Sequence, residues 1–284
     1  MEGRIYMSFF ELSQIKEETE RVRALYEIFD ESTRLKGKAG QMEFLTTVRY
    51  VERYLKPGDR ILDVGAGTGA YSLHFAQQGY QVDALELSER NLTIFRAAIQ
   101  PDDPITAVQG NALDLSRYPD EIFDVVLLFG PLYHLESRED RLAAIREAKR
   151  VCKPDGMLFF AFISNDMVFL TELSYDPDYF ISGDYDKETF RLHNFPFVFH
   201  TVKDCRALLA ESGIRTLHEV ASDGASELMA DRINGMSEES YAQYLRYHFY
   251  ICEKPELLGM SNHLLFVGKK ETAAFCEQGM NKEK

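Results

Sequence analysis

The sequence predicts an α/β fold, in which a mostly parallel sheet carries helices on both faces. Between residues 60 and 163, apolar runs of strand length alternate with segments whose apolar residues recur at helical spacing. Such alternation is typical of parallel strands joined by right-handed helical crossovers. In chain order the expected elements are strand 60–65, helix 70–79, strand 81–86, helix 88–98, strand 105–109, strand 123–129, helix 137–151 and strand 157–163.

Residues 1–56 are expected to form an N-terminal helical extension. Apolar residues recur at helical spacing from Ile15 to Phe29 and again from Leu45 to Leu55, which predicts two helices. The stretch 34–40 between them is basic and contains two glycines, so it is expected to be a loop.

After Ile163 the alternation stops, and residues 164–200 are expected to form an inserted cap. The segment is too aromatic for a disordered linker and too irregular for a sheet core, and prolines interrupt it. Its aromatic side chains could instead form the core of an extra subdomain or a dimer contact. They are Phe169, Tyr175, Tyr179, Phe180, Tyr185, Phe190, Phe195, Phe197 and Phe199.

Regular structure is expected to return over residues 201–270, the C-terminal part of the sheet. Thr201 is a candidate N-cap and Gly213 a candidate stop for the helix between them. The remaining elements are strands near 216–221 and 264–267, with a tyrosine-rich helix inserted at about 236–252. The polar tail after Lys270 is expected to be frayed.

Composition predicts one elaborated domain over residues 1–284, with its core at 57–163. The chain is 45% hydrophobic, and its formal net charge of −14 disfavours nucleic-acid partners, which are polyanions. The four cysteines contain no C-x-x-C pair, which argues against disulfides and a zinc site, so no metal is expected. They are Cys152, Cys205, Cys252 and Cys276.

No membrane segment or secretion signal is expected. The longest apolar run, Met157 to Ile163, is far shorter than the roughly 20 residues of a membrane-spanning helix. The first residues lack the apolar region of a signal peptide. We therefore expect a soluble cytoplasmic enzyme that does not contact membranes.

The segment from Ile61 to Gly69, Ile-Leu-Asp-Val-Gly-Ala-Gly-Thr-Gly, predicts a site for a nucleoside cofactor. Glycines at 65 and 67 permit positive φ angles and a close approach of backbone to ligand, and a helix opens directly after them. Glu86 ends the next strand and could bind ribose hydroxyls. The spacing also fits the dinucleotide pattern G-x-G-x-x-A, so this motif alone leaves the cofactor open.

Further motifs follow the later strands. Gly110-Asn111-Ala112 comes after the third strand, Phe123 to Phe129 forms the fourth, and Lys153-Pro154-Asp155-Gly156 precedes the fifth. With the glycine segment, they resemble the class I S-adenosylmethionine-dependent methyltransferases over residues 55–165. The resemblance implies a Rossmann-like seven-stranded sheet with an antiparallel edge strand. It also implies S-adenosylmethionine as the cofactor, with S-adenosylhomocysteine as product.

The resemblance also implies roles for individual residues. The backbone around Gly65, Ala66 and Gly67 would pass the methionine moiety, and Glu86 would hold the ribose. Leu87 would cover one adenine face, although Leu87 and Ala112 could be simple core residues. The other implied cofactor-binding residues are Asn111 and Ala112 at the adenine edge, Asp63 beneath the glycine loop or linked to the cofactor through water, and Phe129 at the end of the fourth strand.

His134 is the best candidate for a general base, with Tyr133 as its companion. Both follow the fourth strand, where members of the family place residues that touch cofactor and substrate. His134 could equally cap a helix or lie against the cofactor without moving a proton. His193 and His200 flank the cap and are weaker candidates, and His74 is more typical of a packing histidine.

The favoured function is methyl transfer to a small-molecule acceptor. A methyltransferase acting on protein or RNA and a non-catalytic cofactor-binding protein are the alternatives, and an NAD-dependent oxidoreductase is disfavoured by the later motifs. A cap rich in aromatic rings and acids predicts an acceptor that is partly apolar or cationic. The acceptor's identity and the oligomeric state stay open.

Overall fold

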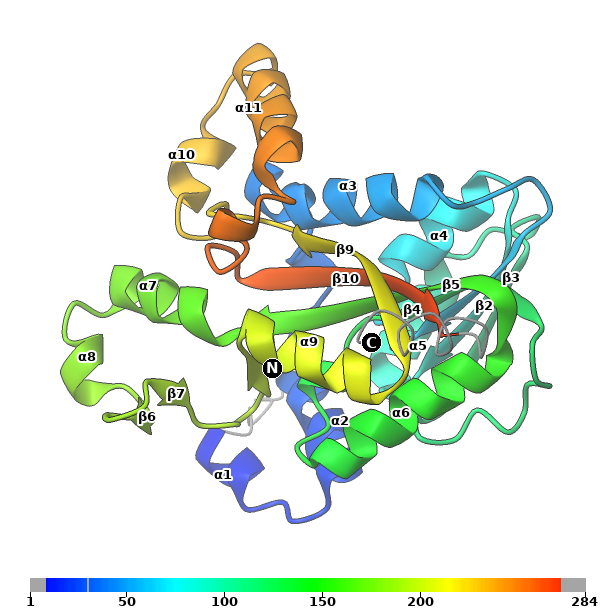
Figure 1. Cartoon of the computed structure of the whole chain (residues 1–284), viewed down its shortest axis with the longest axis horizontal. Helices are drawn as coiled ribbons and strands as arrows, with labels where there is room; N and C mark the ends of the chain where they lie inside the picture. The colour runs from blue at the N-terminus through cyan, green and yellow to red at the C-terminus, as the bar shows by residue number, and fades with distance from the viewer. Residues whose placement is uncertain (1–8, 30, 272–284) are drawn as a thin grey trace, which may run out of the picture.

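The fold is built around a mixed sheet in which seven strands follow the order β3-β2-β1-β4-β5-β10-β9. The computed structural model describes residues 9–29 and 31–271 (Figure 1). All neighbouring pairs along this path are parallel except those of β10, which runs antiparallel to both β5 and β9. The strands are β1 (Arg60–Val64), β2 (Gln81–Glu86), β3 (Ile105–Gln109), β4 (Phe123–Leu128), β5 (Cys152–Ser164), β9 (Ile214–Ala221) and β10 (His263–Lys270).

The predicted α/β class is confirmed, with three corrections. A short extra strand, β8 (Phe199–His200), pairs with β5, so the sheet has eight strands. The antiparallel strand is β10, which lies inside the sheet, and β9 forms the edge. Lys153 to Gly156 belong to β5 and do not precede it, because Cys152 already pairs with Phe123 across an irregular register.

Helices cover both faces of the sheet, as predicted. On one face, α6 (Arg138–Val151) and α9 (Val202–Glu211) pack a buried cluster that includes Leu128 and Phe160. On the other face, α3 (Lys38–Glu52) and α4 (Ala70–Gln77) pack a second cluster that includes Phe75 and Phe159. A further helix, α5 (Glu89–Ala98), buries Leu92 and Phe95 in a separate small cluster. Burial of one such side chain contributes about 1.5–3 kcal/mol.

The N-terminal extension contains more helix than the sequence predicts. It comprises α1 (Phe9–Ser13), α2 (Glu18–Ile28), the short 3₁₀ helix η1 (Glu31–Thr33) and α3. The last of these begins at Lys38, inside the expected loop. Its backbone N–H at Ala39 donates to the Asn234 side chain at 3.0 Å, so a distant segment caps the helix.

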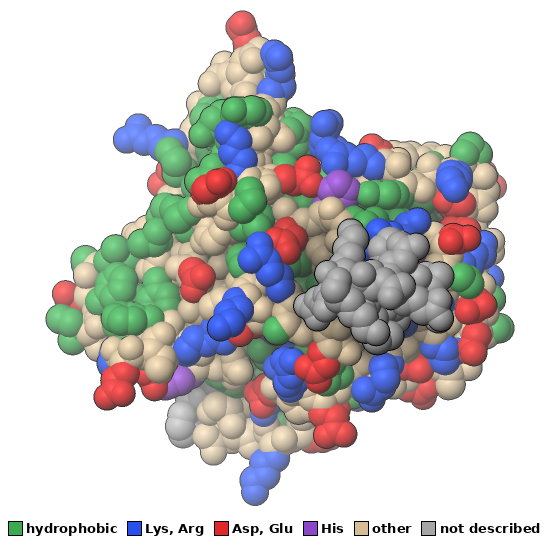
Figure 2. All heavy atoms as spheres, in the orientation of Figure 1, with side chains coloured by type: hydrophobic (Ala, Val, Ile, Leu, Met, Phe, Trp, Pro, Cys, Tyr) green, Lys and Arg blue, Asp and Glu red, His purple; other side chains and the backbone are tan. Residues whose placement is uncertain are grey.

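Two insertions project from the sheet in Figure 1. The cap is largely regular, with α7 (Asn165–Tyr175), α8 (Tyr179–Ser182), β6 (Tyr185–Asp186) and β7 (Arg191–Leu192). The second insertion holds α10 (Ala230–Asn234) and α11 (Glu238–Ile251), followed by the 3₁₀ helix η3 (Pro255–Leu257). Over α7 and α8, hydrophobic side chains gather at the surface (Figure 2), and they include Tyr175 and Ile181.

Some predictions fall where the structure is silent. Cys276 and the polar tail at 272–284 lie outside the described residues, as do residues 1–8. The three described cysteines are buried free thiols. Within residues 9–29 and 31–271, no helix has the length and apolar character needed to cross a membrane.

Thr201 begins α9 through a complete capping box: its hydroxyl accepts from the Asp204 N–H, and the Asp204 carboxylate accepts from the Thr201 N–H. Loss of this cap in Thr201→Ala should lower the free energy of unfolding by about 1 kcal/mol. Urea denaturation followed by circular dichroism measures the change. Thr201→Ser keeps the hydroxyl and should stay near wild type, whereas equal stability of all three proteins would contradict this role.

Candidate functional site

Eight of the nine predicted cofactor-binding residues line one cavity at the carboxyl ends of β1, β2 and β4, which we call the cofactor cavity after the ligand that the sequence predicts. Asp63 is the exception. The loop after β1, the end of β2 and the loop after β3 each contribute residues to its lining. The eight residues are Gly65, Ala66, Gly67, Glu86, Leu87, Asn111, Ala112 and Phe129.

The glycine loop brings backbone into contact with both neighbouring strands. Gly65 has a φ of 82°, and a Cβ there would lie 2.4 Å from the carbonyl oxygen of Phe129. Gly67 has a φ of 57°, and its missing side chain would point into the cavity toward Glu31. Larger residues are therefore excluded at 65 by the protein itself, and at 67 by backbone strain and by the space a ligand needs.

Glu86 is buried and holds the loops after β1 and β2 together. Its Oε2 accepts from the Gly67 N–H at 2.7 Å, and its Oε1 accepts from the Ser88 N–H at 2.8 Å. Burial raises the pKa of this carboxyl, although the two amides act against the shift. Each carboxylate oxygen has a second lone pair, so Glu86 can still accept hydrogen bonds from a ligand in the cavity.

Asp63 lies beneath the loop and does not line the cavity, a position that suits the expected role of orienting the glycine loop. Its Oδ2 accepts from the Ser72 hydroxyl at 2.7 Å, which ties β1 to α4. Burial raises the pKa of Asp63 to about 7. Its Oδ1 has no hydrogen-bond partner among the described residues.

Asn111 is only partly available to a ligand. Its side-chain oxygen accepts from the Leu113 N–H at 3.0 Å, which shapes the loop after β3. The side-chain NH₂ group of Asn111 carries two N–H donors, which a ligand in the cavity could use. Ala112 is buried beside it, and both residues line the cavity.

His134 lines the same cavity, at the end of the 3₁₀ helix η2 (Pro131–Tyr133). Its Nε2 lies 2.7 Å from the hydroxyl of Tyr26, and burial lowers the pKa of the imidazole to about 3. The imidazole is therefore neutral near pH 7. Tyr133 packs against His134 but faces a different cavity.

Tyr26 is a site residue that the sequence analysis missed. It lies on α2, which crosses over the cofactor cavity and adds Glu18, Thr19 and Val22 to its lining. Tyr26 itself lines two cavities, and burial raises the pKa of its hydroxyl well above the usual value. No short sequence motif contains it, because Tyr26 contacts His134, which lies more than a hundred residues later in the sequence.

The second cavity has a volume of about 820 Å³ and adjoins the first. Tyr26, Glu31, Arg34 and Glu43 line both. The cap forms one side, so the inserted aromatic residues do surround a cavity, while Phe169 and Tyr185 form a small core of their own. The aromatic rings that line it are Tyr26, Phe29, Tyr133, Tyr179, Phe195, Phe197 and Phe199. We call it the acceptor cavity, after the role that we propose for it.

Acidic residues dominate the polar lining of the acceptor cavity. Six carboxylates face one guanidinium and two imidazoles: Glu31, Glu43, Glu172, Asp184, Asp223 and Glu227 against Arg34, His193 and His263. Arg34 donates to Glu31 at 2.7 Å and also pairs with Glu43. Burial acts against its charge, but these two carboxylates raise the pKa of Arg34 overall.

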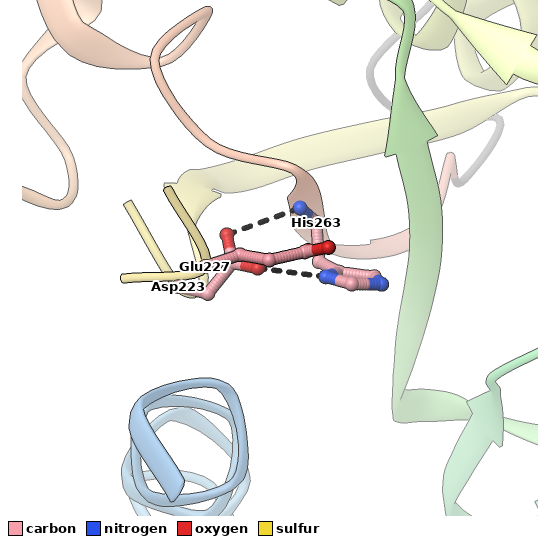
Figure 3. A group of neighbouring side chains, drawn as sticks. All are labelled: Asp223, Glu227 and His263. Carbon is pink, nitrogen blue, oxygen red and sulfur yellow. Dashed lines mark hydrogen bonds and ion pairs between the residues drawn. The ribbon is translucent and has the colours of Figure 1, made fainter. Parts of the chain in front are cut away.

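Asp223, Glu227 and His263 meet in the wall of the acceptor cavity (Figure 3). All three residue types can bind metals, and their ligand atoms lie within 4.8 Å of one another. Two of the three form an ion pair, however, because His263 Nδ1 donates to Asp223 Oδ2 at 2.7 Å. Although burial acts in the opposite direction, Glu43 and Asp223 raise the pKa of His263 to about 9. A metal ion bound there would have to displace the proton that His263 donates to Asp223.

The weaker histidine candidates lie apart from the cofactor cavity. His193 lines the acceptor cavity and pairs with Asp184. His74 packs against Phe44 and Phe75, as expected for a packing histidine. His200 lies in a separate pocket behind the cap.

Comparison with known proteins identifies the domain that contains the cofactor cavity. Residues 62–160 match the methyltransferase domain family. A demethylmenaquinone methyltransferase of Clavibacter sepedonicus is 36% identical over 42% of this chain and 47% of its own. A glycine/sarcosine N-methyltransferase of Aphanothece halophytica is 29% identical over 44% of this chain and 48% of its own. The chain thus spans about half the length of the curated relatives it matches.

Two solved structures share the fold over more of the chain than the matched domain covers. A Pyrococcus horikoshii protein superposes with a TM-score of 0.56 at 18% identity, over 87% of this chain and 98% of its own. A Thermotoga maritima S-adenosylmethionine-dependent methyltransferase gives a TM-score of 0.53 at 18% identity, over 89% and 99%. Residues 62–160 therefore belong to the methyltransferase domain family, and the two solved structures share the fold of the chain around them.

Proposed function

We propose that the protein transfers a methyl group from S-adenosylmethionine to a small-molecule acceptor. The observation that carries this proposal is the junction of two cavities. The cofactor cavity of the methyltransferase domain opens beside the acceptor cavity, and Tyr26, Arg34 and Glu43 line both. A donor and an acceptor held in adjoining cavities react as if they were one molecule, and such positioning accounts for much of an enzyme's rate enhancement.

The residues of the cofactor cavity suit S-adenosylmethionine. The side-chain-free face at Gly67 leaves room for the methionine moiety, and Glu86 offers lone pairs to the ribose hydroxyls. Leu87 is placed to cover the adenine, and Asn111 can donate to its edge. When bound, the cofactor supplies a methyl carbon on a sulfonium, whose positive charge is lost as the methyl group moves.

Tyr26 and His134 can take a proton from an acceptor that arrives protonated. The acceptor's proton would move to Tyr26 Oη while the Tyr26 proton moves to His134 Nε2, so that the phenol ends neutral and the imidazole charged. Burial disfavours this charge in the resting site. Methyl transfer removes the positive charge of the sulfonium, so the imidazolium formed in the same step leaves the total charge of the site unchanged.

The lining of the acceptor cavity favours an acceptor that is partly apolar or cationic. Aromatic rings attract cations through their faces, and carboxylates outnumber basic groups around the same space. The net charge of −14 adds to this preference and disfavours RNA as the acceptor. A protein acceptor is the remaining alternative. Both curated relatives above are named for small-molecule acceptors, which supports the same reading.

Glu86→Ala should weaken S-adenosylmethionine binding tenfold or more, because charge-assisted hydrogen bonds worth about 1.5–3 kcal/mol are lost. Isothermal titration calorimetry measures the change. Glu89→Ala is the matched control, since Glu89 lies three residues away on the surface and outside the cavity. Equal affinity of Glu86→Ala and wild type would exclude Glu86 from the cofactor site.

His134→Gln and Tyr26→Phe should each lower kcat by about 10²–10⁴-fold, the usual contribution of acid–base catalysis. Cofactor affinity should change much less, because neither residue is assigned to the ribose or adenine. Single-turnover kinetics with a protonated acceptor separates the two effects. His74→Gln serves as the control, and an unchanged kcat in both variants would remove the proton relay.

Transfer of labelled methyl groups from S-adenosylmethionine tests the acceptor class. We expect labelling of amines and apolar aromatic compounds, and little labelling of matched compounds that carry a phosphate. Bulk RNA and unfolded protein complete the panel. Labelling of macromolecules alone would overturn the small-molecule proposal.

A further inference from the structure

A third pocket lies behind the cap strand, on the opposite side from the acceptor cavity. It has a volume of about 290 Å³. Leu192 and Phe199 border both spaces, so the same short segment of chain separates them. The polar residues of this pocket line neither of the other two: Arg138, Arg141, Arg191, Asn194, His200 and Asp204.

The charge of this pocket is opposite to that of the acceptor cavity. Three guanidiniums face one carboxylate, that of Asp204. Asp204 Oδ2 accepts from Arg191 at 2.6 Å and also from the N–H and hydroxyl of Thr201, so this one carboxylate already serves Arg191 and the start of α9. Arg138 is paired on its outer side with Glu211.

Among the described residues, the hydrogen-bond partners of Arg141 are backbone carbonyl oxygens. Its Nη1 donates to the carbonyl oxygens of Leu135 at 2.6 Å and Glu136 at 2.8 Å. Its Nε is buried and has no hydrogen-bond partner within residues 9–29 and 31–271. Burial and the neighbouring Arg138 lower the pKa of Arg141. A guanidinium in this setting gains most from an anion, because a carboxylate or phosphate satisfies both its charge and its free donors.

His200 adds a second, independent feature. His200 is 4% exposed, and neither ring nitrogen makes a well-formed hydrogen bond in the described part of the chain, although the Val198 backbone lies close enough to oppose part of the pKa shift. The ring packs edge-on against Phe162 at 5.1 Å and forms part of the pocket wall. Burial lowers the pKa of His200 to about 4, so the neutral ring carries one N–H donor. A buried donor without a partner costs about 1–3 kcal/mol unless a ligand satisfies it.

We propose that this pocket binds a small oxyanion, a phosphate or carboxylate group, through Arg141, Arg191 and His200. The oxygens of an oxyanion act mainly as acceptors, and the pocket offers mainly donors. The net charge of −14 does not prevent binding, because charges farther than about 8 Å are largely screened at physiological ionic strength. Arg141 lies on α6 of the core and Arg191 on β7 of the cap, so the bound anion joins the two. This site is independent of the proposed methyl transfer.

Thermal unfolding and calorimetry of the full chain with inorganic phosphate test the proposal. Sodium acetate forms a second arm, which distinguishes phosphate from carboxylate, and sodium chloride at equal ionic strength is the reference. Wild type should gain thermal stability with phosphate or acetate beyond that with chloride. Arg141→Gln and Arg191→Gln should each weaken binding at least tenfold, whereas Arg146→Gln, an exposed arginine on the same helix, should bind as wild type.

Arg141→Gln and Arg191→Gln change different elements, so the test still holds if one of them misfolds. Circular dichroism checks the fold of each variant. Hydrogen exchange should also show protection of residues 191–200 when the anion is bound. No stabilisation of wild type beyond chloride would overturn the proposal. So would equal stabilisation of wild type, Arg141→Gln and Arg191→Gln, because binding would then not depend on this pocket.

Discussion

The site depends above all on the carboxylate of Glu86, which two backbone amides hold at the end of β2. One amide belongs to Gly67 in the loop after β1, and the other to Ser88 at the start of α5. A single side chain therefore sets the relative position of the loops that follow β1 and β2, both of which contribute to the cofactor cavity. Because the carboxylate is buried, alternative positions in which an amide loses its acceptor would be costly.

The N-terminal extension turns this open edge of the sheet into two adjoining cavities. Helix α2 crosses over the cofactor cavity, and Tyr26 from that helix bonds to His134 from the loop after β4. Arg34 ties Glu31 to Glu43 at the boundary between the two cavities. The cap and the second insertion complete the lining of the second cavity, in which acids and aromatic rings predominate. The loops at the strand ends and the N-terminal extension thus line the first cavity together, and the extension with the two insertions lines most of the second.

Much of the fold follows from local sequence. The strand at 60–64 is a buried apolar run and the turn after it needs glycine, so both could be placed from the residues alone. The capping box at Thr201 is equally local. By contrast, α3 begins early because Asn234 caps it from a segment almost two hundred residues away. The strand β8 is only two residues long and exists because β5 extends far enough to pair with it.

The same distinction applies to the site. Glu86 and the glycines lie at spacings set by one strand-turn-helix unit, so a motif reveals them. Asp63 belongs to that unit too, but its side chain points toward Ser72, and a spacing pattern carries no information on that direction. Tyr26, Arg34 and His263 reach the cavities only through tertiary packing, and no short motif contains them.

The central claim is that the cavity beside Glu86 is a site for S-adenosylmethionine and not for a dinucleotide. Calorimetric titration of the full chain with S-adenosylmethionine, S-adenosylhomocysteine and NAD, under the same conditions, tests it most directly. Saturable binding of both sulfur compounds, with NAD far weaker, is the predicted result. Tight binding of NAD with no binding of either sulfur compound would contradict the account.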